Sequence, residues 1–285
     1  MKNTNLTVKD VELLEILIAK YGKVATTKQI ESEAKDTWDY QQMHNRIQQL
    51  VKNGWLVRIK RGLYGISDLS GRGFLSISPY VVAGLLVEDS YVSFEAALNY
   101  RGMFDQFVQL YSSVSLKQYK MTELEPIHYQ FIKSQEKFYA GWEKVEIENM
   151  SAKIASAEKA LIDLIHFRTS KYVIDLVLEK LQDHKEDLRI EKLIHYASLA
   201  SQKTVKVFGL VFDLLGWDSR ELFQLLTNTR STHWVDVDDK AFNAKWRIYY
   251  DRFSISPVTS RSQIGSAREM SSLLARRSVS NSPRE

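Results

Sequence analysis

The chain has 285 residues, of which 44% are hydrophobic and 26% charged, with no cysteine and a formal net charge of +4. This composition is ordinary for a globular protein and excludes a disulfide scaffold, thiol catalysis and thiolate metal sites. The longest apolar run, residues 80–87, is far shorter than the roughly 20 residues that cross a bilayer. Charged residues also interrupt the N-terminal stretch, so we expect no signal peptide and a cytoplasmic protein.

The charge is unevenly distributed along the chain. Residues 1–67 carry +4, residues 68–253 carry −3 and residues 254–285 carry +3. Within the first segment, residues 40–67 hold five basic side chains and no acidic one. A stretch of a single sign is expected where a chain meets a polyanion. These three segments are our predicted domain organisation.

Residues 1–67 predict three helices followed by a β-hairpin. The first helix runs from about Thr7 to Gly22 and buries an apolar face, for which the spacing predicts Val11, Leu14, Leu17, Ile18 and Tyr21. Thr26 or Thr27 caps a second helix over 28–34, and Asp39 caps a third that ends at Lys52, before Asn53-Gly54. Residues 55–60 and 63–66, joined by Arg61-Gly62, predict two paired strands. This order is typical of a winged helix-turn-helix domain that binds DNA.

The third helix has an apolar face and an opposite polar face. Amide side chains can bond adenine in the major groove, and arginine can bond guanine or phosphate. Because the N-terminal half of such a helix meets the bases, we predict base readout by Gln41, Gln42, Asn45 and Arg46. We predict contacts with the DNA backbone by His44, Gln49, Lys52, Arg58, Lys60 and Arg61. A merely solvated polar face is the alternative.

After an expected linker at residues 68–73, the chain predicts a larger mixed α+β domain. Ser78-Pro79 begins a short helix, and Ser93 caps another over 94–100. Alternating apolar residues between 107 and 155 predict several short strands in one antiparallel sheet. From Ser156 the period becomes helical up to Trp217, and residues 246–250 form a last strand. The fold class is therefore α+β, with the winged helix first.

Residues 254–285 differ in composition from the rest, with ten serines and five arginines. Such a Ser/Arg-rich segment is expected to be disordered. It is either an extension without function, including sequence from another reading frame, or a basic arm that binds nucleic acid.

No catalytic or cofactor motif is present. The six histidines have no zinc-site spacing, and the chain has neither a phosphate-binding glycine loop nor a Gly-x-Ser-x-Gly elbow. One charged cluster, Glu158, Lys159, Asp163 and His166, needs weighing. Asp163 and His166 are three residues apart, so their side chains can meet on one helix. We favour a pair on the helix surface, and an acid–base dyad is the alternative. We expect no enzyme, no metal and no cofactor.

Several segments together resemble the AbiEi antitoxins of type IV, or abortive infection, toxin–antitoxin systems. They are Lys60-Arg-Gly-Leu-Tyr64, the stretch from Tyr91 to Gly102, the stretch from Ala155 to Leu164, and Val211-Phe-Asp-Leu-Leu-Gly-Trp217. Their order and spacing over about residues 1–253 are similar to that family. The resemblance covers nothing of the tail.

The resemblance implies a bacterial protein with two activities. Its winged helix would bind inverted repeats in promoter DNA and repress its own operon, and its C-terminal domain would neutralise a nucleotidyltransferase-class toxin without a stable complex. No catalytic residue carries over, because those of the family belong to the toxin. Two alternatives stay open: a stand-alone winged-helix transcription factor whose C-terminal domain senses a ligand or dimerises, and a catalytic domain that uses Asp163 and His166.

Overall fold

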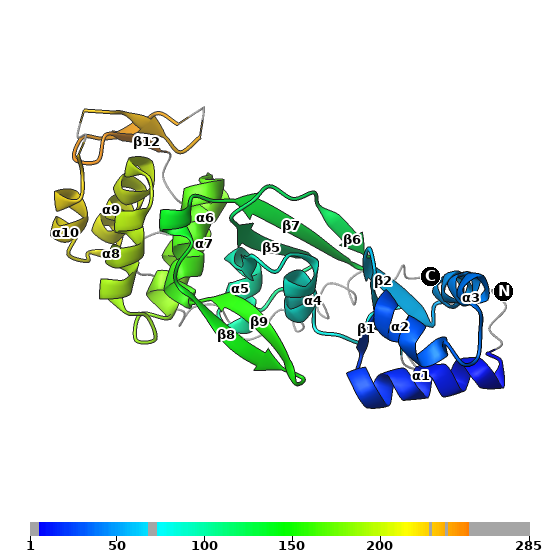
Figure 1. Ribbon diagram of the computed structural model, residues 1–285. Helices are drawn as coiled ribbons and strands as arrows, with labels where there is room; N and C mark the ends of the chain where they lie inside the picture. The colour runs from blue at the N-terminus through cyan, green and yellow to red at the C-terminus, as the bar shows by residue number, and fades with distance from the viewer. Residues whose placement is uncertain (1–5, 68–72, 228–229, 237–238, 251–285) are drawn as a thin grey trace, which may run out of the picture.

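The computed structural model describes residues 6–67, 73–227, 230–236 and 239–250. The expected tail, residues 254–285, and most of the expected linker lie outside these ranges. The described residues form a small N-terminal unit, called the head (residues 6–67), and a larger body (residues 73–250). In Figure 1 the head lies at one end, the large sheet in the middle, and α8–α10 with a small sheet at the other end.

The head has the predicted winged-helix order. Its helices are α1 (Val8–Tyr21), α2 (Thr27–Ala34) and α3 (Tyr40–Lys52), and its strands are β1 (Val24–Thr26), β2 (Leu56–Lys60) and β3 (Leu63–Ile66). Thr7, Thr26 and Asp39 cap the three helices through their side chains, because each accepts a hydrogen bond from a backbone N–H of the first turn. The strands pair in the order β1-β3-β2, all antiparallel. The hairpin was predicted, whereas β1 is an addition.

The buried face of α1 differs from the prediction. Leu14 and Leu17 are buried as expected, but Val11 is 38% and Ile18 50% exposed. The buried positions are Asp10, Leu13, Leu14 and Leu17, which place the contact face about one residue away from the predicted one. The sequence left this open because α1 carries apolar residues on more than one face, so periodicity alone does not select the buried stripe.

The body is built on a six-stranded sheet with the order β6-β7-β5-β4-β9-β8. The strands are β4 (Ser90–Val92), β5 (Leu110–Ser115), β6 (Thr122–Leu124), β7 (Ile127–Lys133), β8 (Trp142–Ile147) and β9 (Met150–Ala155). The prediction of one antiparallel sheet is wrong, because β5 pairs with β7 and β4 with β9 in parallel. Alternation along a strand reports which face is buried, but it carries no information about the direction of the neighbouring strand.

Five helices follow the six-stranded sheet in the described chain, as the change of period predicted: α6 (Ala157–Arg168), α7 (Lys171–Asp183), α8 (Ile190–Leu199), α9 (Gln202–Leu215) and α10 (Arg220–Gln224). Three shorter helices lie before or between its strands: α4 (Pro79–Leu86), α5 (Phe94–Tyr100) and η1 (Glu136–Phe138). A small sheet of β10 (His233–Trp234), β11 (Ala241–Asn243) and β12 (Ile248–Tyr250) ends the described chain. No helix of the described ranges is long and apolar enough to span a membrane.

The head and the body share packing. Ile59 of β2 is 3% exposed and belongs to the body's hydrophobic core, not to the separate core of the head. Lys23 adds polar contacts across the same junction, because its Nζ lies 2.7 Å from Glu148 Oε2 and donates to the Ser76 carbonyl at 2.8 Å. The hairpin is thereby held against the body as well as against α3.

Candidate functional site

The polar face of α3 is exposed, as its sequence predicted. Met43, Ile47 and Leu50 are buried against the rest of the head. At 100° per residue, Gln41, Asn45 and Lys52 lie directly opposite these three, with Gln42, Gln48 and Gln49 to the sides, and all six are exposed. Gln41 Nε2 lies within 3.4 Å of Asn45 Oδ1, which aligns two amides along this face. His44 is half-buried and its Nδ1 lies 3.2 Å from the Tyr40 carbonyl.

Arg46 is placed differently from the other predicted readout residues. Its Nε and Nη2 donate to the two carboxylate oxygens of Asp10, which is completely buried on α1. Nη1 donates to Gln49 Oε1 at 2.7 Å, and Nη2 also lies 3.3 Å from Thr7 Oγ1. Arg46 therefore fastens α3 to α1, and in this structure its guanidinium is not free to bond a base.

The carboxyl group of Asp10 is stabilised in its charged form. Burial by itself raises the pKa of Asp10, but hydrogen bonds from Arg46 and from the Thr7 side chain and backbone outweigh it and hold that pKa below its usual value. The ion pair is thus a permanent feature of the head at neutral pH.

Three residues of the hairpin were predicted to contact the DNA backbone, and all three are exposed: Arg58, Lys60 and Arg61. The hairpin tip is held on the head, because the Gly62 carbonyl accepts a hydrogen bond from Thr27 N of α2. It also lies near the body, because Lys60 Nζ lies 3.4 Å from the Leu86 carbonyl at the end of α4. A hollow of about 590 Å³ opens there, lined by the lysines Lys60, Lys117 and Lys153 and by Glu88 and Asp89. The basic side chain of Lys60 on the hairpin therefore shares a surface with the body.

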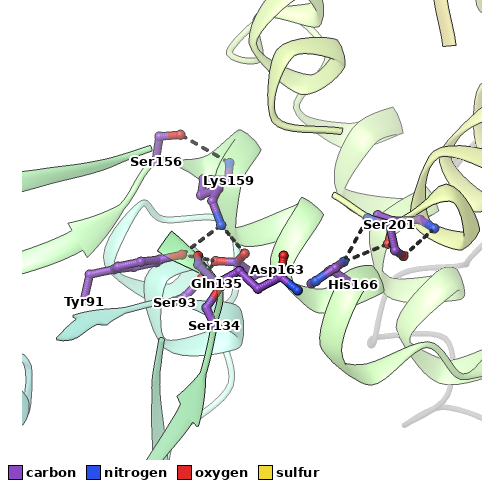
Figure 2. A network of polar contacts seen from close by, with 10 residues as sticks. Tyr91, Ser93, Ser134, Gln135, Ser156, Lys159, Asp163, His166 and Ser201 are labelled. Carbon is purple, nitrogen blue, oxygen red and sulfur yellow. Dashed lines mark hydrogen bonds and ion pairs between the residues drawn. The ribbon is translucent and has the colours of Figure 1, made fainter. Parts of the chain in front are cut away.

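A second polar site lies inside the body, where β4 meets α6 (Figure 2). Lys159 and Asp163, both fully buried, form an ion pair one helical turn apart. Ser93 Oγ donates to Asp163 Oδ2 at 2.6 Å, and Tyr91 OH donates to the same oxygen at 3.2 Å while accepting from Lys159 Nζ at 2.8 Å. The ammonium group also lies 3.7 Å from the centre of the Phe138 ring. Every charge in this network is compensated within the body.

Burial dominates the electrostatics of this pair. It lowers the pKa of Lys159 and raises the pKa of Asp163, while each partner acts in the opposite direction on the other. A buried ion pair of this kind contributes little net stability, but the loss of one partner would leave an uncompensated charge in the core. We assign the network a structural role in joining β4 to α6.

The expected contact between Asp163 and His166 is not formed, and the pair is not on the helix surface. Asp163 turns toward Lys159, Ser93 and Tyr91, whereas His166 Nδ1 lies 3.0 Å from Thr204 Oγ1 and 3.5 Å from the backbone N of Ser201 (Figure 2). Spacing along a helix predicted that the two side chains could meet, but Lys159, at i−4 from Asp163, takes the carboxylate instead.

His166 lines a pocket of about 310 Å³ between the end of β7, η1, and the start of α9. Lys133, Ser134, Lys137 and Ser201 also line it, with Phe167 and Leu199 as apolar walls. Burial, with the positive charges of Lys159 and Lys137, lowers the pKa of His166 to about 4, so the ring is neutral at physiological pH. In the described ranges no three His, Asp or Glu side chains gather as they would around a metal ion.

No protein-family model and no curated protein matches the chain. Among solved structures, the chain is similar to the RV2827C protein from Mycobacterium tuberculosis, with a TM-score of 0.60 and 12% identity, over 87% of this chain and 92% of that one. At this identity the likeness shows the fold: a winged-helix-like unit followed by a larger mixed α+β part. The match extends over both head and body, so the two occur together in another protein.

Two features of the sites were missed by sequence reasoning. Asp10 stands among the buried apolar positions of α1, and an acid on a buried stripe is a signal for a cationic partner that could have predicted the Arg46 ion pair. The pocket beside His166 had no such signal, because its polar side chains come from segments up to 68 residues apart, from Lys133 to Ser201.

Proposed function

We propose that the protein is a DNA-binding transcriptional autorepressor that also acts as an antitoxin. One observation carries the first half: α3 presents Gln41, Gln42 and Asn45 on an exposed face, in a stretch of chain from 40 to 67 that holds five basic and no acidic residues. This combination fits direct readout of base edges flanked by phosphate contacts.

The structure refines the residues of this proposal. We assign base readout to Gln41, Gln42 and Asn45, and backbone contacts to His44, Gln49, Lys52, Arg58, Lys60 and Arg61. Arg46 supports readout indirectly, because its ion pair with Asp10 fixes the angle of α3 on α1. The partner is promoter DNA with inverted repeats, so two heads would bind one operator.

The proposed antitoxin activity rests on the sequence resemblance to the AbiEi family alone. The body would oppose a nucleotidyltransferase-class toxin in the cytoplasm without forming a stable complex and without catalysis of its own. Co-expression with the neighbouring gene tests this half of the proposal. If that gene encodes a toxic nucleotidyltransferase, the full chain should restore growth. Continued growth arrest in the presence of the full chain would contradict the proposal.

A gel-shift titration against the region upstream of the gene tests DNA binding. With about four phosphates contacted per half-site, the slope of log affinity against log salt should be roughly −4, from about −0.9 per contact. A flat salt response, or no binding, would refute the proposal.

Variants separate the two kinds of contact. Asn45→Ala should change the preference among operator sequences by about 1–3 kcal/mol per contacted base pair, because it removes a bidentate amide. Lys52→Ala should weaken binding to all sequences alike and reduce the salt slope by about 1, because it removes one phosphate contact. Lys144→Ala, an exposed lysine on β8, is the matched control and should change neither quantity. Identical behaviour of Asn45→Ala and Lys52→Ala would contradict our assignment.

A second candidate function is a transcription factor whose body senses a small ligand. The pocket beside His166 favours it, because it is a defined hollow in the body, lined by polar and cationic side chains. A ligand that binds the body and changes DNA affinity in the gel shift would support this function over the antitoxin alternative.

A further inference from the structure

The pocket beside His166 is a cationic hollow whose charges are not used inside the protein. Lys133 and Lys137 are exposed at its rim, and in the described part of the chain neither ammonium group lies within 4.0 Å of a carboxylate oxygen. Two unpaired ammonium groups at one opening create a local positive potential.

His166 lies in the same pocket and is neutral. Burial, and then the positive charges of Lys159 and Lys137, lower the pKa of this ring. Its Nδ1 faces the N–H of Ser201 and the hydroxyl of Thr204, so Nδ1 accepts and the proton of the neutral ring resides on Nε2. Among the described residues Nε2–H has no acceptor, and it is therefore a hydrogen-bond donor available to a ligand.

The remaining lining supplies hydroxyl groups and an apolar wall. Ser134 and Ser201 also line the pocket, but their hydroxyl protons are used inside the protein, because Ser134 Oγ donates to the Gln135 carbonyl at 3.3 Å and Ser201 Oγ donates to Thr204 Oγ1 at 2.9 Å. Figure 2 shows Ser201 beside His166. Phe167 and Leu199 offer apolar surface in the same lining. The pocket thus combines ammonium groups, a neutral donor and apolar contact in about 310 Å³, at the lower end of the range of small-molecule sites.

From this donor set we infer that the pocket binds a small phosphate ester, with the phosphate held by Lys133, Lys137 and the Nε2–H of His166 and the organic group against Phe167 and Leu199. A phosphate offers three acceptor oxygens and a charge near −2, which matches two ammonium groups and the Nε2–H of His166 without a carboxylate in the lining. The inference concerns the body alone and holds whether or not the head binds DNA.

The test is a binding titration of the full chain with AMP, inorganic phosphate and adenosine, followed by calorimetry and by the ring-proton signal of His166 in NMR spectra. AMP should bind and shift the His166 signal, inorganic phosphate should bind more weakly at the same place, and adenosine should not bind. The double variant Lys133→Ala/Lys137→Ala should bind AMP at least about tenfold more weakly, because it removes two charge-assisted hydrogen bonds.

The matched control is Lys120→Ala/Lys144→Ala, which removes two exposed lysines away from the pocket and should leave affinity unchanged within about twofold. Equal losses in the two double variants would show unspecific attraction to surface charge and overturn the inference. So would adenosine binding as tightly as AMP, AMP binding without a change at His166, or no binding of either phosphate compound at millimolar concentration. All substituted lysines are exposed, so each variant is expected to fold.

Discussion

Asp10 and Arg46 show how one pair of residues determines the geometry of a whole helix. The carboxylate is fully buried, and the guanidinium that covers it is about a quarter exposed. Because α1 and α3 meet at this point, the direction of the exposed amide face on α3 depends on an ion pair that lies outside that face. Leu17 of α1 and Ile47 and Leu50 of α3 belong to the same hydrophobic core of the head.

Arg46→Met should lower the free energy of unfolding by about 3 kcal/mol, since it leaves a buried carboxylate without its partner. Because the folded pKa of Asp10 lies below the ordinary value of 3.8, the contribution of the pair is complete at neutral pH and is lost as the pH falls from that value through the folded pKa. Urea denaturation at pH 7 and at pH 3 measures this, and the difference between variant and parent should shrink in acid. Arg58→Met, at an exposed arginine, is the control and should cost little at either pH. An Arg46→Met variant as stable as the parent at pH 7 would contradict the assignment.

At the scale of elements, α9 is fixed by a close approach between a glycine and a tryptophan. Trp246 is completely buried and its Nε1 donates to Asp213 Oδ2 at 2.7 Å. A Cβ on Gly209 would lie 2.1 Å from Cη2 of that indole, far inside van der Waals contact. The glycine is therefore what allows the turn before β12 to pack on α9.

Gly209→Ala should destabilise the protein by about 2 kcal/mol or more, because a rigid ring in a packed core must move to admit the methyl group. Gly84→Ala in α4 is the matched control: nothing lies within 4 Å of the added Cβ, and alanine favours a helix by about 1 kcal/mol over glycine. Thermal unfolding should move in opposite directions for the two variants. A Gly209→Ala protein with an unchanged melting temperature would refute this account of the contact.

Local signals predicted the elements well and their assembly less well. The caps Thr7, Asp39 and Ser156, the proline after Ser78 and the stop at Gly54 marked helix ends, because these effects act within one turn. Ser78 itself makes no side-chain capping hydrogen bond. The parallel pairing of β5 with β7, and of β4 with β9, depends on connections of many residues and leaves no local trace.

One candidate site could be predicted from the sequence and the other could not. The exposed amides of α3 follow from helix periodicity. The contact of Asp163 with Tyr91 joins residues 72 positions apart, so no local pattern predicts it. The segments from Tyr91 to Gly102 and from Ala155 to Leu164 lie far apart in the sequence, and together they supply Tyr91, Ser93, Lys159 and Asp163 of this buried network.

At the scale of the whole molecule, Ile59 belongs to the hairpin by sequence and to the body by packing. Ile59→Ala should lower stability by about 3 kcal/mol, as expected for a large buried aliphatic side chain. Amide hydrogen exchange should accelerate in α4 as well as in β2 and β3, because the side chain lies in the core that these elements share. Val57→Ala, two residues away at a half-buried position, should have a smaller effect confined to the head. Faster exchange in the head alone would show that the two units are energetically independent.

The contact between Lys60 and the Leu86 carbonyl has a thermodynamic consequence. We propose that the amine of Lys60 binds a DNA phosphate, and in this structure it also contacts the carbonyl at the end of α4. The free energy of the proposed phosphate contact therefore depends on the position of that helix. Coupling of this kind is reciprocal: whatever binds the body and displaces α4 changes the operator affinity by some factor, and operator DNA changes the affinity of that ligand by the same factor. Under the repressor function that we propose, an event in the body would therefore reach the DNA through this contact without any separate signalling element.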